Sequence, residues 1–306
     1  MNHARQMPAI AAVVITFFPD EGVRCRLEAM ARECGRVVVV DNGSGAAVTD
    51  RLAMAGVEVV ALTENQGLAA ALNIGLNRVR ELGYEWTVTF DQDSTPQPGM
   101  VAALWASRQG FAEPERVTVV GPRLREERVE HEDHRWVVPH ERCRWWFRRA
   151  PCRERDLAGV AFVITSGALM DLRAFAKIGP MDDGLFIDYI DHDYCLRARR
   201  MGFEVLVSAK AMLVHNLGAK QEFTVAGRKV RPTFHSALRL RYMARNRWVV
   251  WRRYAWAFPH WAAFDAVYSH YNLLRVLAFE DGRGAKLAAV VRGTWDGLRG
   301  RRGRIL

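Results

Sequence analysis

The sequence predicts an α/β protein, in which a doubly wound sheet is followed by a helical, basic C-terminal region. Three observations support this fold class. The chain has 306 residues and is 50% apolar, which is enough to bury a large core. Short apolar runs alternate with helical patterns through residues 9–90. The excess of basic residues lies towards the C-terminal end, so we divide the chain into domains at 1–238 and 239–306.

The expected strands are short runs rich in β-branched and other apolar residues. Continuous apolar runs of this kind are typical of strands that are covered on both faces, as in a parallel sheet. They occupy residues 9–18, 36–40, 57–62 and 86–90, and residues 20–35 and 68–82 have helical character. The alternation of strands and helices therefore predicts a doubly wound domain.

Polar side chains stand where these strands end. Thr16, Asp41, Asn65 and the pair Asp91 and Asp93 all occupy such positions. In doubly wound sheets, ligands bind at the carboxyl ends of the strands. The sequence therefore predicts that these residues share one site.

The chain changes character over residues 123–157, which are dense in charge and contain three tryptophans. We expect a long excursion over the site, and a plain solvated insertion is the alternative. Afterwards the chain returns to strand and turn character, with a helix at 172–178 and a strand at 204–208.

Asp91-Gln92-Asp93 is the strongest local signal. Two carboxylates separated by one residue, at the end of a strand, suit a divalent cation that also binds substrate phosphates. An isolated D-x-D motif more often belongs to an ordinary turn, in which aspartate is common. The preceding strand and the other polar strand ends favour the metal interpretation here.

Asp41 and His215 each admit two interpretations. Asp41 begins the turn sequence DNGS, and its carboxylate either stabilises that turn or accepts an N–H from a pyrimidine base. His215 follows a strand-like run and is either structural or a further metal ligand.

Three carboxylates, on Asp188, Asp191 and Asp193, precede a basic segment. If the segment is helical throughout, Asp188 and Asp191 share a face, and their like charges would raise a pKa towards the range of a general base. The alternative is an acidic helix N-terminus that is stabilised by the helix dipole.

Five features follow one another along the chain: VVVVDNGS, ENQGLAAALNIGL, FDQDS, the segment from SGALMDL at residue 166 to FEV at 205, and His215. This ordered set resembles the family-2 glycosyltransferases with the GT-A fold, a doubly wound mixed sheet with a Rossmann-like nucleotide-binding half. LFIDYIDHDYCLRARRMG and RYMARNRW further resemble bacterial rhamnosyltransferases of polysaccharide assembly. The resemblance covers roughly residues 10–250.

The resemblance implies a role for each candidate residue. Thr16 and Asp41 would line the pocket for the base, and Asn65 and Gly67 would shape the loop beside the nucleoside. Asp91, Gln92 and Asp93 would hold the nucleotide sugar and Mg²⁺ or Mn²⁺, with His215 completing the metal shell.

The catalytic base, by the same resemblance, falls at Asp191 when the motif is aligned on Cys195. Many relatives have an acidic pair where this chain has Ile190 and Asp191, and Asp188 could share the role. The QxxRW motif of processive relatives is absent, which favours single transfers.

The implied function is inverting transfer of L-rhamnose from dTDP-rhamnose to a glycan or lipid-linked acceptor in cell-surface polysaccharide biosynthesis. Galactofuranose or N-acetylglucosamine, carried on UDP, remain alternatives, as does a sugar nucleotidyltransferase. The last of these would usually show a glycine-rich phosphate loop near the first strand, which ITFFPDEG does not supply. A non-catalytic membrane-binding protein would have no use for Asp91, Asp93, Asp191 and His215 together.

The C-terminal region carries the charge of the chain. Residues 231–306 hold fifteen Lys/Arg and four Asp/Glu, which leaves 29 basic and 30 acidic residues elsewhere. Five tryptophans are interleaved with these arginines, and this pattern suits an anionic membrane surface. A helical subdomain with a basic solvated face is the alternative, and no motif supports binding to nucleic acid.

The expected location is the cytoplasm, peripheral on the inner face of the cell membrane. The N-terminus has no signal-peptide pattern, no run of about twenty apolar residues is present, and the five cysteines are scattered, as expected for reduced thiols. Association with further copies of the chain is left open by the sequence.

Overall fold

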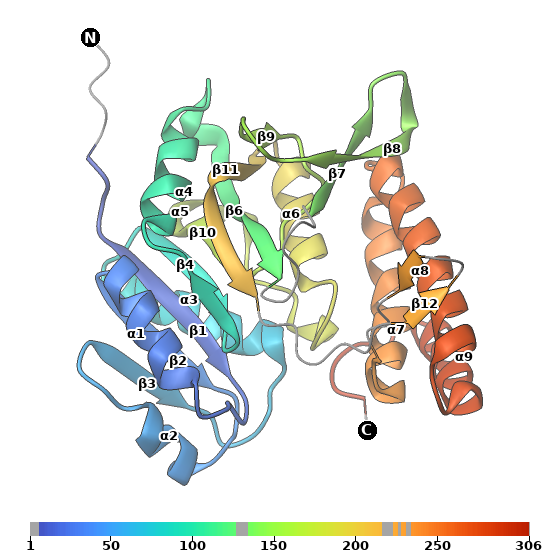
Figure 1. The fold of residues 1–306 in the computed structure, drawn as a ribbon, viewed down its shortest axis with the longest axis horizontal. Helices are drawn as coiled ribbons and strands as arrows, with labels where there is room; N and C mark the ends of the chain where they lie inside the picture. Colours follow the sequence, from blue (N-terminus) through green and yellow to red (C-terminus); the bar gives the residue numbers. More distant parts are fainter. Residues whose placement is uncertain (1–5, 127–133, 216–222, 226–227, 231–233, 306) are drawn as a thin grey trace.

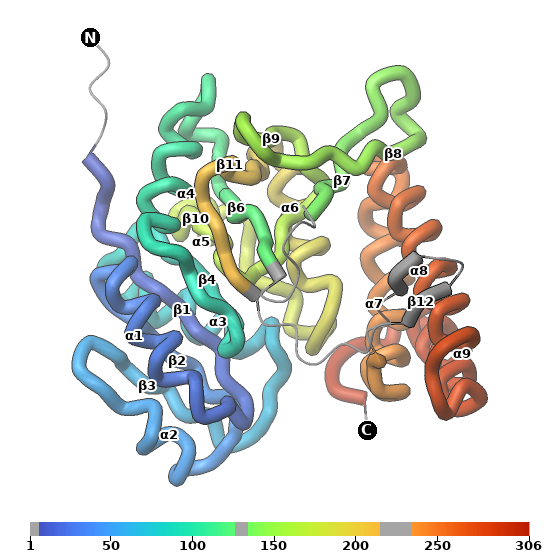
Figure 2. Tube along the Cα trace, viewed as in Figure 1, coloured from blue at the N-terminus to red at the C-terminus, as the bar shows by residue number. Residues whose placement is uncertain are grey.

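The structure is a computed structural model, which describes residues 6–126, 134–215, 223–225, 228–230 and 234–305. Figure 1 shows a sheet flanked by helices on the left and a group of C-terminal helices on the right, with a hairpin at the top between them. The tube in Figure 2 shows that the C-terminus turns back beneath the helices, towards the central segments of the chain.

The main sheet is mixed, as the resemblance implied. Its strands follow the order β3-β2-β1-β4-β10-β6-β11-β5, with β9 paired to β11. The first four are parallel, whereas β10 runs antiparallel to both of its neighbours. The bounds are β1 Ile10–Thr16, β2 Arg36–Asp41, β3 Val57–Ala61, β4 Trp86–Asp91, β5 Ser94–Pro96, β6 Val117–Glu126, β9 Leu157–Ala158, β10 Ala168–Asp171 and β11 Glu204–His215.

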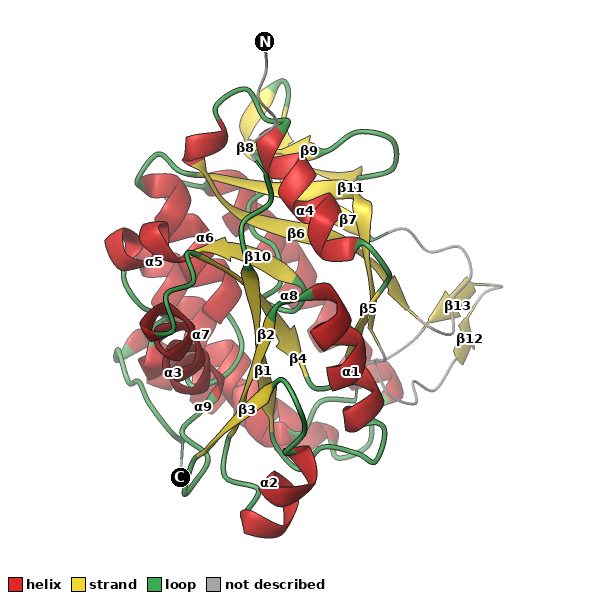
Figure 3. Ribbon diagram, turned by 90° about the vertical axis from the view of Figure 1, so that its left-hand side faces the viewer, coloured by secondary structure: helices red, strands yellow, loops and turns green. Residues whose placement is uncertain are grey.

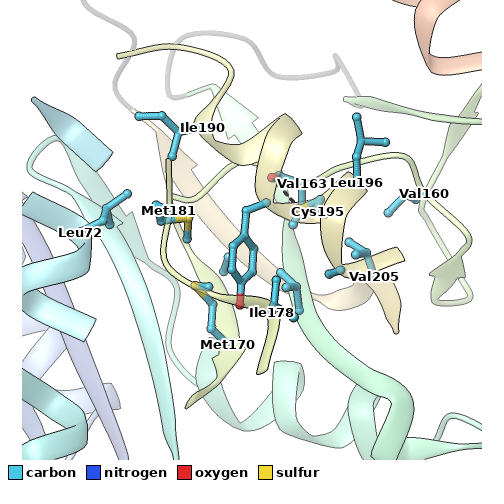
Figure 4. Close-up of a cluster of buried hydrophobic side chains, with 14 of the residues drawn as sticks. Leu72, Val160, Val163, Met170, Ile178, Met181, Ile190, Cys195, Leu196 and Val205 are labelled. Carbon is cyan, nitrogen blue, oxygen red and sulfur yellow. Dashed lines mark hydrogen bonds between the residues drawn. The ribbon is translucent and has the colours of Figure 1, made fainter. Parts of the chain in front are cut away.

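Helices cover both faces of this sheet (Figure 3). The bounds are α1 Val23–Glu33, α2 Ala46–Leu52, α3 Leu68–Glu81, α4 Met100–Gln109, α5 Leu172–Ile178 and α6 Ile190–Arg200, with 3₁₀ turns at Pro114–Arg116 and Asp183–Leu185. Strand β1 shows why both faces are apolar, since Val13 packs into the core beneath α3 and its neighbour Val14 into the core beneath α1 and α4. Figure 4 shows the part of the first core that lies around α6.

The predicted strands and helices of the first ninety residues are confirmed, with ends that shift by a few residues. The sequence did not predict α2, α4 or β6. The strand expected at 204–208 continues to His215. The charged excursion contains an antiparallel hairpin of β7 Arg135–His140 and β8 Cys143–Pro151, which stands apart from the main sheet.

The C-terminal region is helical, as predicted, and comprises α7 Ala237–Tyr254, α8 Pro259–Phe279 and α9 Arg283–Leu298, after a short β-ribbon of β12 Phe223–Val225 and β13 Arg228–Val230. Helices α7 and α9 pack closely because α9 presents glycines to α7. A Cβ at Gly297 would lie 2.4 Å from the carbonyl oxygen of Arg245. Within the described residues, no helix is both long and apolar enough to cross a membrane. All five cysteines are free thiols.

Much of the basic charge of this region faces the rest of the protein. Arg253 lies 2.7 Å from both Asp182 and Asp193, and Arg302 pairs with Asp182 as well. Arg304 lies 3.1 Å from Glu64. The acidic segment before and within α6 is therefore a partner of the basic region inside the same chain.

Candidate active site

One cavity of about 1360 Å³ lies between the sheet and the C-terminal helices. It brings together eight of the ten residues that the sequence singled out, from segments up to 175 positions apart. The eight are Thr16, Asn65, Gly67, Asp91, Gln92, Asp93, Asp188 and Asp191. Of the five strand-end residues that were predicted to share one site, all but Asp41 line this cavity.

Asp91 and Asp93 lie where β4 ends and the chain turns into β5. The turn is fixed by two serines, because the Asp91 N–H donates to Ser166 Oγ (3.1 Å) and Ser166 Oγ lies 2.7 Å from Ser94 Oγ. Ser94 pairs with His215 across β5 and β11. The backbone of His215 therefore runs beside the residue that follows Asp93.

The carboxylates of Asp91 and Asp93 are suitable ligands for a divalent cation. Two carboxylates on one turn are the oxygen ligands that Mg²⁺ and Mn²⁺ prefer. Among the side chains that the structure describes, which do not include that of His215, no group of three or more His, Cys, Asp or Glu is close enough to hold an ion. Phosphate oxygens of a substrate would have to complete the shell.

Asp41 is fully buried and is held by its own turn. Its carboxylate accepts hydrogen bonds from Thr16 Oγ1 (2.9 Å), from the Ser44 N–H and from Ser44 Oγ (both 2.7 Å). The turn interpretation of DNGS therefore has direct contacts in the structure. Acceptance of a base N–H stays a prediction, in which Thr16 is the member of the pair that lines the cavity.

Gly67 lies where the loop before α3 meets the segment that leads to α6. Asn65 Oδ1 accepts hydrogen bonds from the Gly67 N–H (2.9 Å) and from Asn42 Nδ2 (3.2 Å), which fixes the loop. Gly67 has φ of +90°, and a Cβ there would lie 2.6 Å from the ring of Phe186. Only glycine allows this close approach without strain.

Gln92 links two neighbouring strand ends that line the cavity. Its side chain accepts a hydrogen bond from the Phe17 N–H (2.7 Å) and donates one to the Phe17 carbonyl (3.3 Å). Gln92 thereby ties the turn after β4 to the end of β1.

The segment before α6 has an unusual backbone. Phe186, Asp188 and Tyr189 all have φ between +62° and +65°, and α6 begins only at Ile190. The expectation that Asp188 and Asp191 share a helix face is therefore wrong, because Asp188 lies in the preceding turn. Such strained residues persist only where the surrounding structure holds them.

Asp188 and Asp191 have different surroundings. Arg239 of α7 donates to both carboxylate oxygens of Asp188, at 3.0–3.3 Å. Arg239 lines the cavity, and although its burial acts in the opposite direction, its pairing with Asp188 and the charge of Asp91 raise the pKa of its guanidinium.

The pKa of Asp191 is raised to about 7, chiefly by burial of its carboxyl group, with a smaller contribution from the charge of Asp188. The neighbours beneath it, including Val163, Met170 and Met181, are apolar. The pKa shift that the sequence predicted is present, but burial causes most of it. Asp191 and Asp193 also stand in the first turn of α6, so the alternative interpretation holds as well.

The C-terminal helices hold the strained segment by its carbonyl groups. Asn246 Nδ2 donates to the carbonyl oxygens of Leu185 (2.8 Å), Ile187 (2.7 Å) and Asp188 (3.1 Å). Arg245 donates to the Leu185 carbonyl at 3.0 Å. Both residues are buried, so α7 fixes the turn that precedes Asp191.

A buried carboxylate of α8 holds the same segment by its side chains. Asp265 accepts hydrogen bonds from Tyr189 Oη (2.6 Å) and Trp251 Nε1 (2.7 Å), and Arg247 lies 3.2 Å from it. Next to Asp191, His192 accepts a hydrogen bond from Trp261 Nε1 at 2.9 Å.

Sequence reasoning missed Arg239, Asn246 and Asp265 as parts of the site. The motif RYMARNRW contains Asn246, but its resemblance to rhamnosyltransferases assigned no role to that residue. Burial of the polar side chains of Arg245 and Asn246 is unfavourable unless they have hydrogen-bond partners, and the sequence does not show those partners.

Part of this chain is similar to a known protein family. Residues 33–179 match glycosyl transferase family 2. The chain is 26% identical to the dTDP-rhamnosyl transferase RfbF of Shigella flexneri, over 95% of this chain and 96% of that protein.

Two solved structures are similar in fold. One is GalNAc-T7 with UDP, GalNAc and Mn²⁺, with a TM-score of 0.57 and 12% identity, where the match covers 80% of this chain and 47% of that one. The other is TarS 1-349 of S. aureus, with a TM-score of 0.50 and 10% identity, covering 96% and 72%. At these identities the likeness confirms the GT-A type fold alone.

Proposed function

We propose that this chain is a family 2 glycosyltransferase and that it transfers L-rhamnose from dTDP-rhamnose to a hydroxyl group of a glycan or lipid-linked acceptor. The match of residues 33–179 to that family supports the first part of the proposal. The observation that carries the proposal is that Asp91, Asp93 and Asp191 line the same cavity. The rhamnosyl donor is supported by the similarity to the Shigella flexneri transferase across nearly the whole chain.

The donor is proposed to bind at the edge formed by β1, β2 and β4. Thr16, Asn65 and Gly67 would surround the nucleoside, with Asp41 beneath them. Asp91 and Asp93, assisted by His215, would hold Mg²⁺ or Mn²⁺, which neutralises charge on the departing diphosphate when it is bound. Gln92 would keep this edge in register with β1.

Asp191 is proposed as the general base. Its raised pKa gives its carboxylate the proton affinity to accept the proton of an acceptor hydroxyl near neutral pH. The carboxylate of Asp188 already accepts hydrogen bonds from Arg239, so we assign it to positioning that cation.

The stereochemical outcome follows from these roles. The acceptor oxygen forms its bond to the anomeric carbon as the bond to the diphosphate oxygen breaks, and the hydroxyl proton passes to Asp191. Since no protein nucleophile takes part, the anomeric configuration inverts. Holding the two substrates in line supplies a large part of the rate enhancement.

An anionic membrane surface is the proposed place of action, with the protein peripheral on the cytoplasmic side. The support is the combination of exposed tryptophans and arginines in and near the C-terminal region. A lipid-linked acceptor would be presented at such a surface.

The deciding experiment is a thermal-shift panel with dTDP-rhamnose, UDP-galactofuranose and UDP-N-acetylglucosamine, each with and without Mn²⁺. We expect Tm to rise only with the dTDP sugar and to rise further with Mn²⁺. Asp93→Asn is the control, in which the Mn²⁺-dependent part should disappear. A response to UDP sugars alone would overturn the donor, and no response to any nucleotide sugar would overturn the function.

A further inference from the structure

An exposed aromatic patch joins the β7–β8 hairpin to the C-terminal region. Trp145 and Trp146 of β8 are each 51% exposed, and Trp256, in the turn between α7 and α8, is 82% exposed. Trp145 and Trp256 contact each other edge to face, with ring centroids 6.4 Å apart. Large aromatic side chains are rarely left this exposed without a partner.

The patch is surrounded by positive charge. Residues 135–151 contain five arginines and one acidic residue, Glu141. Arg142, Arg144 and Arg148 are exposed, and the guanidinium of Arg144 lies 5.1 Å from the centre of the Trp145 ring. Tryptophan and arginine together are the composition that favours the headgroup region of an anionic bilayer.

The patch also connects to the cavity through a series of contacts between aromatic rings. Trp146 stacks on Phe147, whose ring meets Phe264 of α8 edge to face, and Phe264 packs beside Phe162. Phe162 and Phe264 line the cavity, as does Trp136 at the base of the hairpin. A partner surface that binds the patch would therefore lie close to the cavity.

We propose that Trp145, Trp146 and Trp256, with Arg142, Arg144 and Arg148, dock the protein on an anionic lipid surface. The lipid contact of this docking patch is independent of the proposed function. Only its purpose, which is to present a lipid-linked acceptor to the cavity, rests on that function. It moves the membrane contact from the C-terminal helices in general to the hairpin and the α7–α8 turn. Figure 1 shows the hairpin at the top of these helices and α9 at the lower right.

Helix α9 provides a matched control, because Trp295 is 54% exposed and also lies against an arginine, Arg299. The test is co-sedimentation of the full chain with vesicles of phosphatidylcholine, alone or with one third phosphatidylglycerol. We expect wild type to bind the anionic vesicles only. The triple variant W145A/W146A/W256A should bind at least tenfold more weakly, and W295A should bind like wild type.

The arginine variant R142Q/R144Q/R148Q should also lose binding, and its residual binding should depend less on salt. All measurements are made without donor or acceptor, so failure of rhamnosyl transfer would leave this result unaffected. Circular dichroism and thermal unfolding, also measured without donor, show that each variant is folded.

Three results would overturn the proposal. The first is a failure of anionic vesicles to retain the wild-type protein. The W295A variant, rather than the triple variant, would lose binding if α9 were the contact. Finally, light scattering would show a dimer that becomes a monomer in the triple variant, without vesicle binding, if the patch joined two copies of the chain.

Discussion

The two walls of the cavity are built in different ways. The donor wall consists of the ends of neighbouring strands within residues 16–93. There Thr16 donates a hydrogen bond to Asp41, and the Gln92 side chain bonds the backbone of Phe17. The wall around Asp191 depends on a strained turn that is held by α7 and α8, from more than fifty residues away.

With the proposed roles of these residues, this difference would separate donor binding from catalysis. The donor wall is braced by the sheet, so it should survive changes in the C-terminal helices. The wall around the base should lose its geometry first when its contacts with α7 or α8 are removed. Variants in the two walls are therefore expected to give different kinetic signatures, and four predictions test this.

The largest effect is expected for Asp191→Asn, which removes the proposed base and keeps its size. Transfer should fall about 10²- to 10⁴-fold, while the Kd for the donor stays near that of wild type. Asp93→Asn, on the donor wall, should weaken both. Steady-state kinetics combined with calorimetric titration of the donor distinguish the two, and loss of donor binding in Asp191→Asn would contradict the assignment.

Asn246→Ala tests whether α7 positions the base. The carbonyl groups of Leu185, Ile187 and Asp188 lose their shared donor, so kcat should fall about 10- to 100-fold with little change in the KM for the donor. The apparent pKa of the rate should shift as well, because the surroundings of Asp191 relax.

Asn73→Ala is the matched control for that variant, since Asn73 is also a helical asparagine whose side chain bonds backbone groups of another segment, in its case the N–H and carbonyl of Met181. It should lower Tm without changing the pH profile. If both variants changed Tm alone, Asn246 would have a merely structural role.

The pH dependence of transfer tests the pKa of Asp191 directly. A base must be ionised, so kcat/KM should fall about tenfold for each pH unit below the apparent pKa of about 7. Because burial disfavours the ionised form, this group costs stability as the pH rises towards 7, and the cost is absent below pH 4. Asp191→Asn should therefore raise Tm at pH 8 but not at pH 4, and a flat rate profile from pH 5.5 to 8 would contradict the role.

The smallest effect concerns the packing that supports the wall around the base. Gly297→Ala should destabilise the protein by about 1–3 kcal/mol, because its Cβ would meet the Arg245 carbonyl. Gly284→Ala in the same helix is the control, since nothing lies within 4 Å of a Cβ there, and it should stabilise by up to about 1 kcal/mol. Urea unfolding curves measure both, and equal values for the two variants would show that α7 and α9 adjust freely.

The sequence by itself determined the strands of the first half and the polar residues at their ends. Apolar runs and turn residues are local patterns, and parallel strands bring their carboxyl ends to one edge, so Thr16, Asn65, Asp91 and Asp93 were predictable as neighbours. The same local patterns gave the C-terminal region its helices and its charge.

Only the tertiary structure decided what lies opposite that edge. Asp188 and Asp191 are three residues apart and similar by sequence, yet one bonds Arg239 and the other is set against apolar side chains. The partners Arg239, Asn246 and Asp265 come from helices that pack against the domain, and part of the basic charge neutralises Asp182, Asp188 and Asp193. Such contacts join distant segments, and no local pattern of residues encodes them.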